Sequence, residues 1–433
     1  MGSGSAGKGK GTSLKIAYLT GVFPATSQTF IMREIQALKD YGIEIKGFAA
    51  KRSGDAGVEE ELLEVDQKWI FARPDNLWPH LVSNLKNLVL HPRRYLAALG
   101  FFLRQAAKMD PPAFARLLYH FFCGIGFCER MRQEGIHHMH CHFSTGTNMA
   151  LAAHLFGGIS FSFTAHASGD IFVRPILIEE KVKHAEFVVA VCDYSRKYLD
   201  SITRYRYSPK ISRIYNGIEI SEPRRLLRHY RSGGGEQKDQ NGQFRIVSVG
   251  RLIGCKGFAT LIKALRILEE RGKPGECRII GEGGEQKTLE GLIREWGLTD
   301  RISLTGSLPL HQVYEALREA DVFVLLSEIH EDGFRDGFPT VVLEAMAMSL
   351  PVVATRISGI PEMVIHEETG LLVEERDAAG AAEAIERLMS AREWGARLGE
   401  AGRKRVAEKF ALDRSIEAFV HLLRENLPSV PGR

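Results

Sequence analysis

Apolar and polar positions alternate along this chain in two repeating blocks. From Lys15 onward, short apolar runs are followed by amphipathic stretches, a pattern typical of parallel βαβ units. The first run, KIAYLTGVF, predicts a strand, and residues 26–42 predict a helix with Ile31, Ile35 and Leu38 on one face and a glycine stop. Further strands are predicted in IEIKGFAA, IHHMHCHF, SFSFTAHA, EFVVAVC and KISRIYN.

The pattern breaks after Ile220 and then resumes. Residues 224–242 (RRLLRHYRSGGGEQKDQNG) have no apolar period and predict a linker. A second series of strands is predicted in FRIVSVG, CRIIG, ISLTG, DVFVLLS, PVVAT and GLLV. Its helices are predicted at residues 259–270, 287–296, 311–320, 340–348 and 378–390, and two more helical stretches end the chain.

This periodicity predicts an α/β protein with two doubly wound, Rossmann-like domains that face each other across a cleft. A length of 433 residues with 44% hydrophobic composition suits two domains of roughly 200 residues. We expect a disordered tail or expression remnant at 1–13, domains at 14–222 and 244–408, a linker at 223–243, and a helix at 409–433 that returns to the first domain. Open α/β sheets bind ligands outside the carboxyl ends of their strands, so the site is expected there.

Composition excludes some classes of protein. The net charge of +4 is too small to indicate nucleic acid, and the six cysteines are scattered without a C-x-x-C pair. Buried free thiols in a reducing compartment are therefore expected. No run of 18 apolar residues is present and the N-terminus lacks the apolar core of a secretory signal, which predicts a cytoplasmic protein.

A predicted helical insertion at residues 78–135 concentrates positive charge. It carries eight Lys or Arg against three acidic residues and is rich in Leu, Phe and Tyr. This mixture suits a membrane surface or a lipid-linked substrate, and a solvated basic face on a helical pair is an equally good interpretation. The hypothesis of peripheral contact with an anionic membrane assigns it to Arg93, Arg94, Arg104 and residues 121–127.

Candidate phosphate-binding residues follow the first two strands of the second domain. VGRLIGCKG places Gly250, Arg251 and Lys256 on one loop, which predicts a diphosphate clamp because Arg offers a planar fork and Lys a point charge. The next strand ends in IIGEGGE, where Gly281 and Gly283 would let a ligand approach the backbone.

The stretch FRDGFPTVVLEAMAMSLPVVAT contains two carboxylates, and Glu344 lies inside an otherwise apolar helix, which predicts a buried charge that needs a partner. Asp336 precedes it by eight residues, at most about 12 Å along a helix. The two could bracket a nucleotide sugar, with amides at the helix N-terminus binding phosphate or hydroxyls. Alternatively, Glu344 pairs with a structural cation and Asp336 caps the helix. The remaining residues of this predicted donor site are Gly337, Phe338, Pro339 and Thr340.

The histidines of IHHMHCHF invite a metal interpretation. Alternation sends His138, His140 and His142 to one face, but neighbours two apart lie about 6.6 Å from each other, so convergence on one ion is awkward and no metal is predicted. Instead, His142 with the following Ser144 and Thr145 is expected to face an acceptor. At the next strand end, His166 and Asp170 are similar candidates, and the alternative for His166 is a structural histidine.

These motifs, in this order, resemble the retaining GT-B fold glycosyltransferases of family 4, with their Glu-x7-Glu pair. Together with SGIPEMV and GLLV, and with HCHFSTGTNMALAAHLFGG, CDYSRKYL and YNGIE in the first domain, the likeness runs from Lys15 and is similar to the bacterial colanic-acid branch. The resemblance implies that the second domain binds the donor and the first the acceptor. Arg251 and Lys256 would then hold the diphosphate and Glu344 the ribose. By the same likeness His166 would lie near the reacting sugar, while Asp336 replaces the first Glu.

The function implied is transfer of a sugar, with retention, from a nucleoside diphosphate sugar to a glycan hydroxyl, the glycan being lipid-linked. No cofactor, metal or nucleic acid is expected, and the catalytic set is His166, Asp336, Arg251 and Lys256. A nucleotide-sugar epimerase or hydrolase of the same fold, and a non-catalytic sugar-binding scaffold, remain open alternatives.

Overall fold

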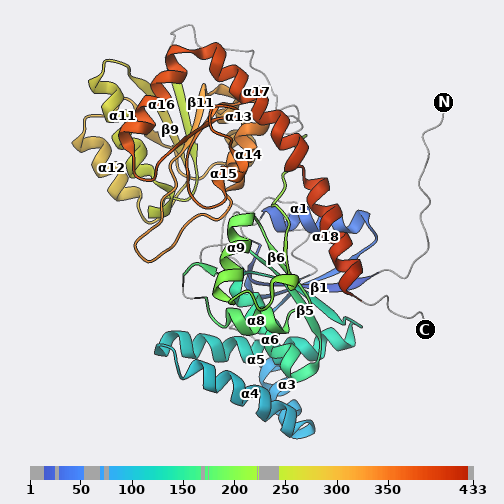
Figure 1. Ribbon diagram of the computed structural model, residues 1–433. Helices are drawn as coiled ribbons and strands as arrows, with labels where there is room; N and C mark the ends of the chain where they lie inside the picture. The colour runs from blue at the N-terminus through green and yellow to red at the C-terminus, as the bar shows by residue number, and fades with distance from the viewer. Residues whose placement is uncertain are drawn as a thin grey trace, which may run out of the picture. The chain divides into compact units, whose positions relative to one another are not determined.

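The computed structural model describes residues 14–24, 29–52, 69–72, 78–166, 171–173, 175–221, 223 and 243–427 (Figure 1). The predicted tail at 1–13, nearly all of the linker at 223–243, and Asp170 lie outside the described residues. Two compact units are present. One contains Met1–Thr164, Glu179–Val188 and Ile416–Arg433, and the other contains Ala165–Ile178 and Val189–Ser415.

A seven-stranded sheet forms from the first series of predicted strands. Its order is β3-β2-β1-β4-β5-β6-β7, and β1 pairs in parallel with both β2 and β4. All the predicted strands are present, and the two-residue β3, too short for an apolar pattern, is an addition. The strands are β1 (Lys15–Phe23), β2 (Glu44–Arg52), β3 (Ile70–Phe71), β4 (His138–His142), β5 (Ser160–Ala165), β6 (Val188–Ala190) and β7 (Ile211–Arg213).

Helices connect these strands, and α5 and α6 pack with their backbones close together. Gly124 of α5 faces α6, where an added Cβ would lie 2.3 Å from the carbonyl oxygen of Met149. The helices are α1 (Thr29–Asp40), α3 (Trp78–Leu90), α4 (Pro92–Ala106), α5 (Pro111–Gln133), α6 (Phe143–Gly157), α8 (Ile178–His184) and α9 (Asp193–Ile202).

The second series forms a six-stranded parallel sheet in the order β10-β9-β8-β11-β12-β13. This is the doubly wound order, and its direction of winding reverses between β8 and β11, which defines the switch point. The strands are β8 (Phe244–Val249), β9 (Gly275–Ile280), β10 (Ile302–Leu304), β11 (Val322–Leu325), β12 (Val352–Thr355) and β13 (Leu371–Val373).

Helices cover both faces of this sheet, and alternate residues of a strand enter different cores. In β11, Phe323 joins a cluster with α13 and α14, while Val324 joins a cluster with α11 and α16. The five predicted helices agree with the structure within one residue at each end. The helices are α11 (Phe258–Glu270), α12 (Gln286–Glu295), α13 (Leu310–Glu319), α14 (Thr340–Ala347), α15 (Ile360–Met363), α16 (Ala378–Ser390) and α17 (Arg392–Lys409).

The last helix, α18 (Leu412–Asn426), contributes to the first unit from Ile416 onward. The ring of Phe419 lies 4.6 Å from that of His140 and 6.2 Å from that of Phe187. These contacts place an aromatic side chain from the end of the chain against strand β4.

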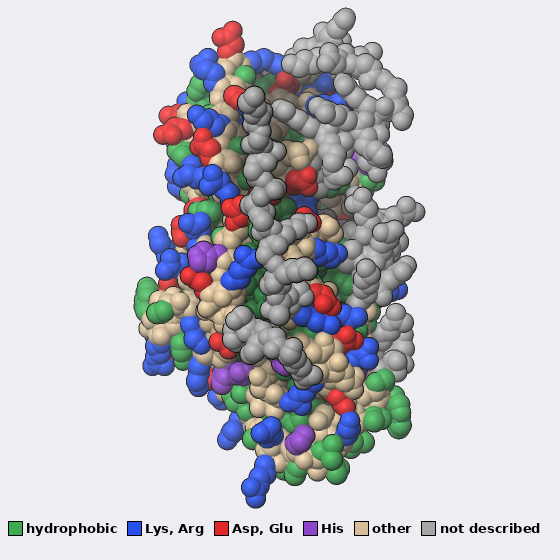
Figure 2. Space-filling view, turned by 90° about the vertical axis from the view of Figure 1, so that its right-hand side faces the viewer, with side chains coloured by type: hydrophobic (Ala, Val, Ile, Leu, Met, Phe, Trp, Pro, Cys, Tyr) green, Lys and Arg blue, Asp and Glu red, His purple; other side chains and the backbone are tan. Residues whose placement is uncertain are grey.

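The predicted insertion at 78–135 consists of α3, α4 and α5. In Figure 2, hydrophobic side chains gather with Lys and Arg at the lower end of the molecule, the level at which Figure 1 draws α3 and α4. The predicted apolar contact segment is wrong in its main residues, because Phe121 and Phe127 are buried in the core and only Phe122 is substantially exposed. In the described part of the chain, no helix has both the length and the hydropathy of a membrane span.

All six cysteines are buried and free of disulfides, as predicted. Burial raises the pKa of several of these thiols, including that of Cys192 to about 11. They are therefore core side chains with little thiolate character near neutral pH.

Candidate functional site

Two loops meet at the switch point of the second sheet and carry an ion pair. The Nζ atom of Lys256 lies 2.9 Å from Oδ2 of Asp336, and the Ser327 hydroxyl donates to the same oxygen at 2.8 Å. Ser327 is held in turn by Thr355, whose hydroxyl donates to the Ser327 carbonyl oxygen at 2.6 Å. The two charged side chains are only 12% and 18% exposed, so the attraction between them is weakly screened by water.

The path of the chain after β8 explains how Lys256 reaches this position. A short 3-10 turn, η4 (Gly254–Lys256), is followed by Gly257 in the left-handed region at φ 67°, and α11 begins there. A Cβ on Gly257 would lie 1.7 Å from the carbonyl oxygen of Leu326, and the Glu328 amide donates to the Cys255 carbonyl at 2.8 Å. Backbone thus packs directly on backbone, which brings the two loops together.

The glycines predicted to open the site to a ligand instead face neighbouring loops. Gly281 has φ 141°, and its amide donates to the Gly306 carbonyl oxygen at 2.9 Å. An added Cβ would lie 1.9 Å from the Gly250 oxygen, and one on Gly283 would lie 2.4 Å from the Leu252 oxygen. Loop packing therefore explains Gly281 and Gly283, and a ligand contact at Gly250, Gly281 or Gly283 stays a prediction.

Arg251 is exposed beside this loop. Burial first, and then the charge of Asp336, raise the pKa of the Cys255 thiol to about 12, while Lys256 and Arg251 oppose the shift. Both predicted clamp cations and the carboxylate therefore lie near enough to the Cys255 thiol for their charges to act on it.

Helix α14 begins at Thr340, with Pro339 as the residue before it and no side chain capping its N-terminus. Asp336 therefore does not cap this helix, and that half of the alternative is wrong. The ring of Phe338 is buried and stacks on Tyr215 at 5.3 Å. Since the Phe338 side chain belongs to the core, only its backbone is available to a ligand.

Glu344 differs from its prediction in burial. It lies in α14 between the buried Leu343 and Ala345 but is itself only half-buried. The cost of desolvating its carboxylate is therefore smaller than that of a fully buried charge. Its predicted ribose contact does not depend on deep burial and stays a prediction.

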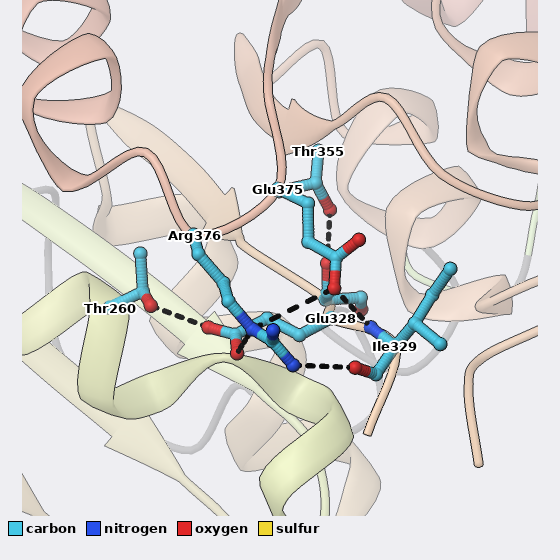
Figure 3. A network of polar contacts seen from close by, with 7 residues as sticks. Thr260, Glu328, Ile329, Thr355, Glu375 and Arg376 are labelled. Atoms are coloured by element: carbon cyan, nitrogen blue, oxygen red, sulfur yellow. Dashed lines mark hydrogen bonds and ion pairs between the residues drawn. The ribbon is translucent and has the colours of Figure 1, made fainter. Parts of the chain in front are cut away.

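A polar network that the sequence did not reveal supports the loop after β11 (Figure 3). The Thr260 hydroxyl donates to Glu328 at 2.5 Å, and Nε of Arg376 lies 3.2 Å from the other Glu328 oxygen. Arg376 also donates to the Ile329 carbonyl at 2.7 Å, and the Ile329 amide donates to Glu375 at 2.7 Å. This network joins α11, the β11 loop and the turn after β13, so it fixes the backbone leading to Asp336.

The loop before Asp336 is also held by groups distant in sequence. Arg335 donates to the Tyr194 hydroxyl at 2.8 Å, and its guanidinium lies 4.9 Å from the centre of the Phe172 ring. Glu362 accepts hydrogen bonds from the amides of Asp193 and Tyr194, each at 2.8 Å. None of these pairings has a local sequence signal, because their partners are over a hundred residues apart.

In the first unit, His142 ends β4 and is fully buried, with Nε2 3.3 Å from Oε1 of Glu34 in α1. The Tyr18 hydroxyl donates to the same Glu34 oxygen at 2.5 Å, and burial, followed by the Glu34 charge, raises the pKa of Tyr18. An acceptor contact of His142 stays a prediction.

Glu34, His140 and His142 offer potential metal-ligand atoms within 4.8 Å of one another. The strand pattern could not reveal this, because Glu34 comes from a different element. Both ring nitrogens of His140 already bond to hydroxyls, of Ser162 at 2.8 Å and of Thr164 at 2.9 Å. An ion bound through His140 would therefore have to displace the hydroxyl of Ser162 or that of Thr164.

The other acceptor-side candidates lie at the carboxyl ends of β4 and β5. Ser144, in the first turn of α6, accepts a hydrogen bond at 2.8 Å from the buried Lys181. Thr145 lies against Gly21, where an added Cβ would be 2.8 Å from the Thr145 Cβ. His166 directly follows β5 and is half-buried, and its grouping with Asp336 stays a prediction.

Comparison with known proteins identifies the chain. A family model described as Glycosyltransferase Family 4 matches residues 27–222, and one described as Glycosyl transferases group 1 matches residues 235–405. The chain belongs to the family 4 glycosyltransferases. Both halves of this glycosyltransferase thus match, including the loops that carry Lys256 and Asp336.

Curated relatives extend the match. The colanic acid biosynthesis glycosyltransferase WcaL of Escherichia coli is 27% identical over 86% of this chain and 90% of its own length. The amylovoran biosynthesis glycosyltransferase AmsK of Erwinia amylovora is 41% identical over 33% of this chain and 35% of its own. The resemblance to the colanic-acid branch is therefore confirmed.

Solved structures confirm the GT-B fold of this glycosyltransferase. Sucrose-phosphate synthase from Thermosynechococcus elongatus matches with a TM-score of 0.69 at 19% identity, over 95% of this chain and 98% of that one. Anabaena HepE, in complex with UDP-glucose, matches with a TM-score of 0.66 at 16% identity, over 95% and 100%. At such identities the likeness concerns the fold.

Buried histidines of this glycosyltransferase form a ladder of hydrogen bonds with hydroxyls of β5. The ladder bonds, 2.8 to 2.9 Å long, join His138 to Ser160 and Ser162, and His140 to Ser162 and Thr164. The Ser160 hydroxyl donates to the His137 carbonyl oxygen, so it must accept from Nδ1–H of His138. Repeating this logic along the ladder makes both histidines neutral Nδ1–H tautomers.

Acidification is expected to destabilise the fold through His138. Burial lowers its pKa from an ordinary value of about 6.5 to about 3. Because the folded pKa is depressed, His138 contributes stability above pH 6.5, and this is lost as pH falls and the unfolded chain takes up the proton. Between pH 7 and pH 5 the loss is about 2 kcal/mol.

Urea unfolding at several pH values measures this effect. The His138→Gln variant should have a free energy of unfolding that varies less with pH than that of the wild type, whereas His137→Gln, at an exposed neighbour, should keep the wild-type dependence. Identical pH dependence in all three proteins would contradict the assignment.

Proposed function

We propose that this glycosyltransferase transfers a sugar from a nucleoside diphosphate sugar to a hydroxyl of an exopolysaccharide intermediate that is lipid-linked, with retention and without a metal ion. The observation that carries the proposal is the Lys256–Asp336 pair at the switch point, with a distance of 2.9 Å. The names of the colanic acid and amylovoran relatives support the substrate class, and the UDP-glucose complex of Anabaena HepE supports the donor class.

Donor binding would give the charged side chains of this site new partners. A diphosphate offers oxygens to Lys256 and to the exposed Arg251, while Asp336 accepts hydrogen bonds from sugar hydroxyls. Glu344, half-buried on α14, would accept a hydrogen bond from a ribose hydroxyl. Each charged group would thus gain a partner of opposite character in the donor.

The chemical step needs charge stabilisation more than protonation. The bond from the anomeric carbon to the diphosphate breaks, and negative charge develops on the leaving oxygen beside Lys256 and Arg251. The acceptor oxygen bonds to the anomeric carbon from the same face, and its proton passes to the departing phosphate. Asp336 already accepts bonds from Lys256 and Ser327, so we assign it the role of a hydrogen-bond acceptor for the donor sugar.

Calorimetric titration with UDP, GDP and ADP, without metal, tests the donor site. We expect one nucleotide to bind, and Glu344→Ala to weaken that binding about 30-fold, because a charge-assisted hydrogen bond is lost. The matched control, Glu383→Ala, removes an exposed carboxylate from α16 and should leave affinity unchanged.

Failure of all three nucleotides to bind would contradict the proposal and favour the sugar-binding scaffold. Nucleotide binding followed by donor hydrolysis or epimerisation, with no transfer to a glycan, would favour the other enzyme class.

A further inference from the structure

Helix α3 buries polar side chains and exposes apolar ones, the reverse of an ordinary surface helix. Ser83, Asn84 and Asn87 are buried. The exposed side consists of large apolar residues, which we call the α3 face: Trp78, Leu81, Val82, Leu85 and Val89. Trp78 is 71% exposed and Val89 77%, and the spacing of the five places them on one stripe about 16 Å long.

The buried polar side chains make specific contacts that fix this orientation. The Asn84 amide donates to the Phe122 carbonyl oxygen at 3.0 Å and its carbonyl accepts from the Tyr95 hydroxyl at 2.9 Å. The Ser83 hydroxyl donates to Glu129 of α5 at 3.0 Å. Turning the helix to bury the α3 face would break these bonds and leave buried polar groups unsatisfied, so the apolar stripe stays exposed.

Basic side chains outnumber acidic ones around the α3 face. Helices α3 and α4 contain no Asp or Glu. Lys86 flanks the stripe and pairs with Glu129, while Arg93, Arg94 and Arg104 are exposed on α4. Two further apolar side chains, Leu90 and Leu96, are exposed beside these arginines. Apolar and cationic groups thus share one surface, as in helices that lie in a membrane interface.

We propose that the α3 face inserts into the headgroup region of an anionic lipid bilayer, with Arg93 and Arg94 at the lipid phosphates. A bilayer offers both an apolar depth for the stripe and negative charge for the arginines. A second copy of the chain would bring the same positive charges to the contact, which disfavours self-association. The inference rests on the proposed function in one respect, because the membrane would hold the lipid-linked acceptor that the enzyme uses.

Sedimentation with vesicles tests this contact independently of catalysis. The full chain is mixed with vesicles of phosphatidylcholine alone or with phosphatidylglycerol, and the partition coefficient is measured. We expect the wild type to bind anionic vesicles more strongly than neutral ones. The double variant Leu85→Asp with Val89→Asp should lower the partition coefficient at least about 30-fold, because two apolar side chains that would insert into the lipid are replaced by charges that anionic lipid repels. Arg93→Glu with Arg94→Glu should remove the preference for anionic lipid.

A matched control is Tyr205→Asp, which replaces another exposed large side chain, 68% exposed, in the turn after α9, and should partition like the wild type. Equal partitioning of the wild type and the α3 variant would overturn the inference. A wild type that binds no vesicles but forms a dimer, with a monomeric α3 variant, would also overturn it. The nucleotide titration separates this failure from that of the proposed function, because the α3 variant should bind nucleotide as the wild type does.

Discussion

Replacing Lys256 with Ala is expected to lower kcat/KM for sugar transfer by about a thousandfold. On the proposed mechanism, this ammonium group stabilises the charge that develops on the departing diphosphate, and removing one such preorganised group costs about 10² to 10³ in rate. The change also leaves Asp336 without its ion-pair partner at 2.9 Å, with the Ser327 hydroxyl still donating to it. Both effects act at the same step, so the upper end of the range is expected.

Release of nucleoside diphosphate from the donor, in the presence of glycan acceptor, measures this loss. Lys263→Ala is the matched control, since Lys263 is exposed on α11, the helix that follows the Lys256 turn. A reduction below about tenfold for Lys256→Ala, in a protein with an unchanged melting temperature, would exclude Lys256 as the main group that stabilises the leaving charge.

Gly257→Ala is expected to destabilise the second unit by about 4 kcal/mol or more. Its Cβ would lie 1.7 Å from the Leu326 carbonyl oxygen, where no rotamer change relieves the overlap because the obstacle is backbone. The strand β11 and the start of α11 would have to separate, and changes of this kind lie in the extreme tail of single substitutions. Lys256 and Asp336 would move apart with them.

The matched control is Gly272→Ala at the other end of α11. Gly272 has φ 68°, almost the same as the 67° of Gly257, but nothing lies within 4 Å of its added Cβ. It should cost only about 1–2 kcal/mol, the price of a left-handed non-glycine residue. Equal losses for the two variants in chemical unfolding would mean that backbone conformation, and not the clash with Leu326, sets the cost.

The fold was largely predictable because the strand and the helix of each βαβ unit have their own periodicity of apolar residues. Strand β11 and helix α16 follow directly from apolar runs and helical spacing, and the site was expected at the carboxyl ends of such strands, where Lys256 and Asp336 lie. The pattern failed where burial did not follow polarity. It assigned the exposed apolar surface to residues 121–127, whereas α5 buries Phe121 and α3 exposes Leu85.

The supporting contacts of the site could not be predicted, since they join residues far apart in sequence. Glu328 meets Arg376 across 48 positions, and Glu34 meets His142 across more than a hundred. A carboxylate has the same local signal whether it is solvated or paired, so only the tertiary structure assigns its partner. The partial burial of Glu344 could not be predicted either, because it depends on which residues cover α14.

The Lys256–Asp336 pair has a consequence for selectivity under the proposed function. A ligand that carries only phosphate can replace Asp336 as the partner of Lys256 but leaves the carboxylate poorly compensated. A ligand that carries only hydroxyls can bind Asp336 but leaves the ammonium group of Lys256 poorly compensated. A nucleotide sugar can satisfy both at once, so the resting pair penalises incomplete donors such as free phosphate or free sugar, and discrimination is built into the unliganded site.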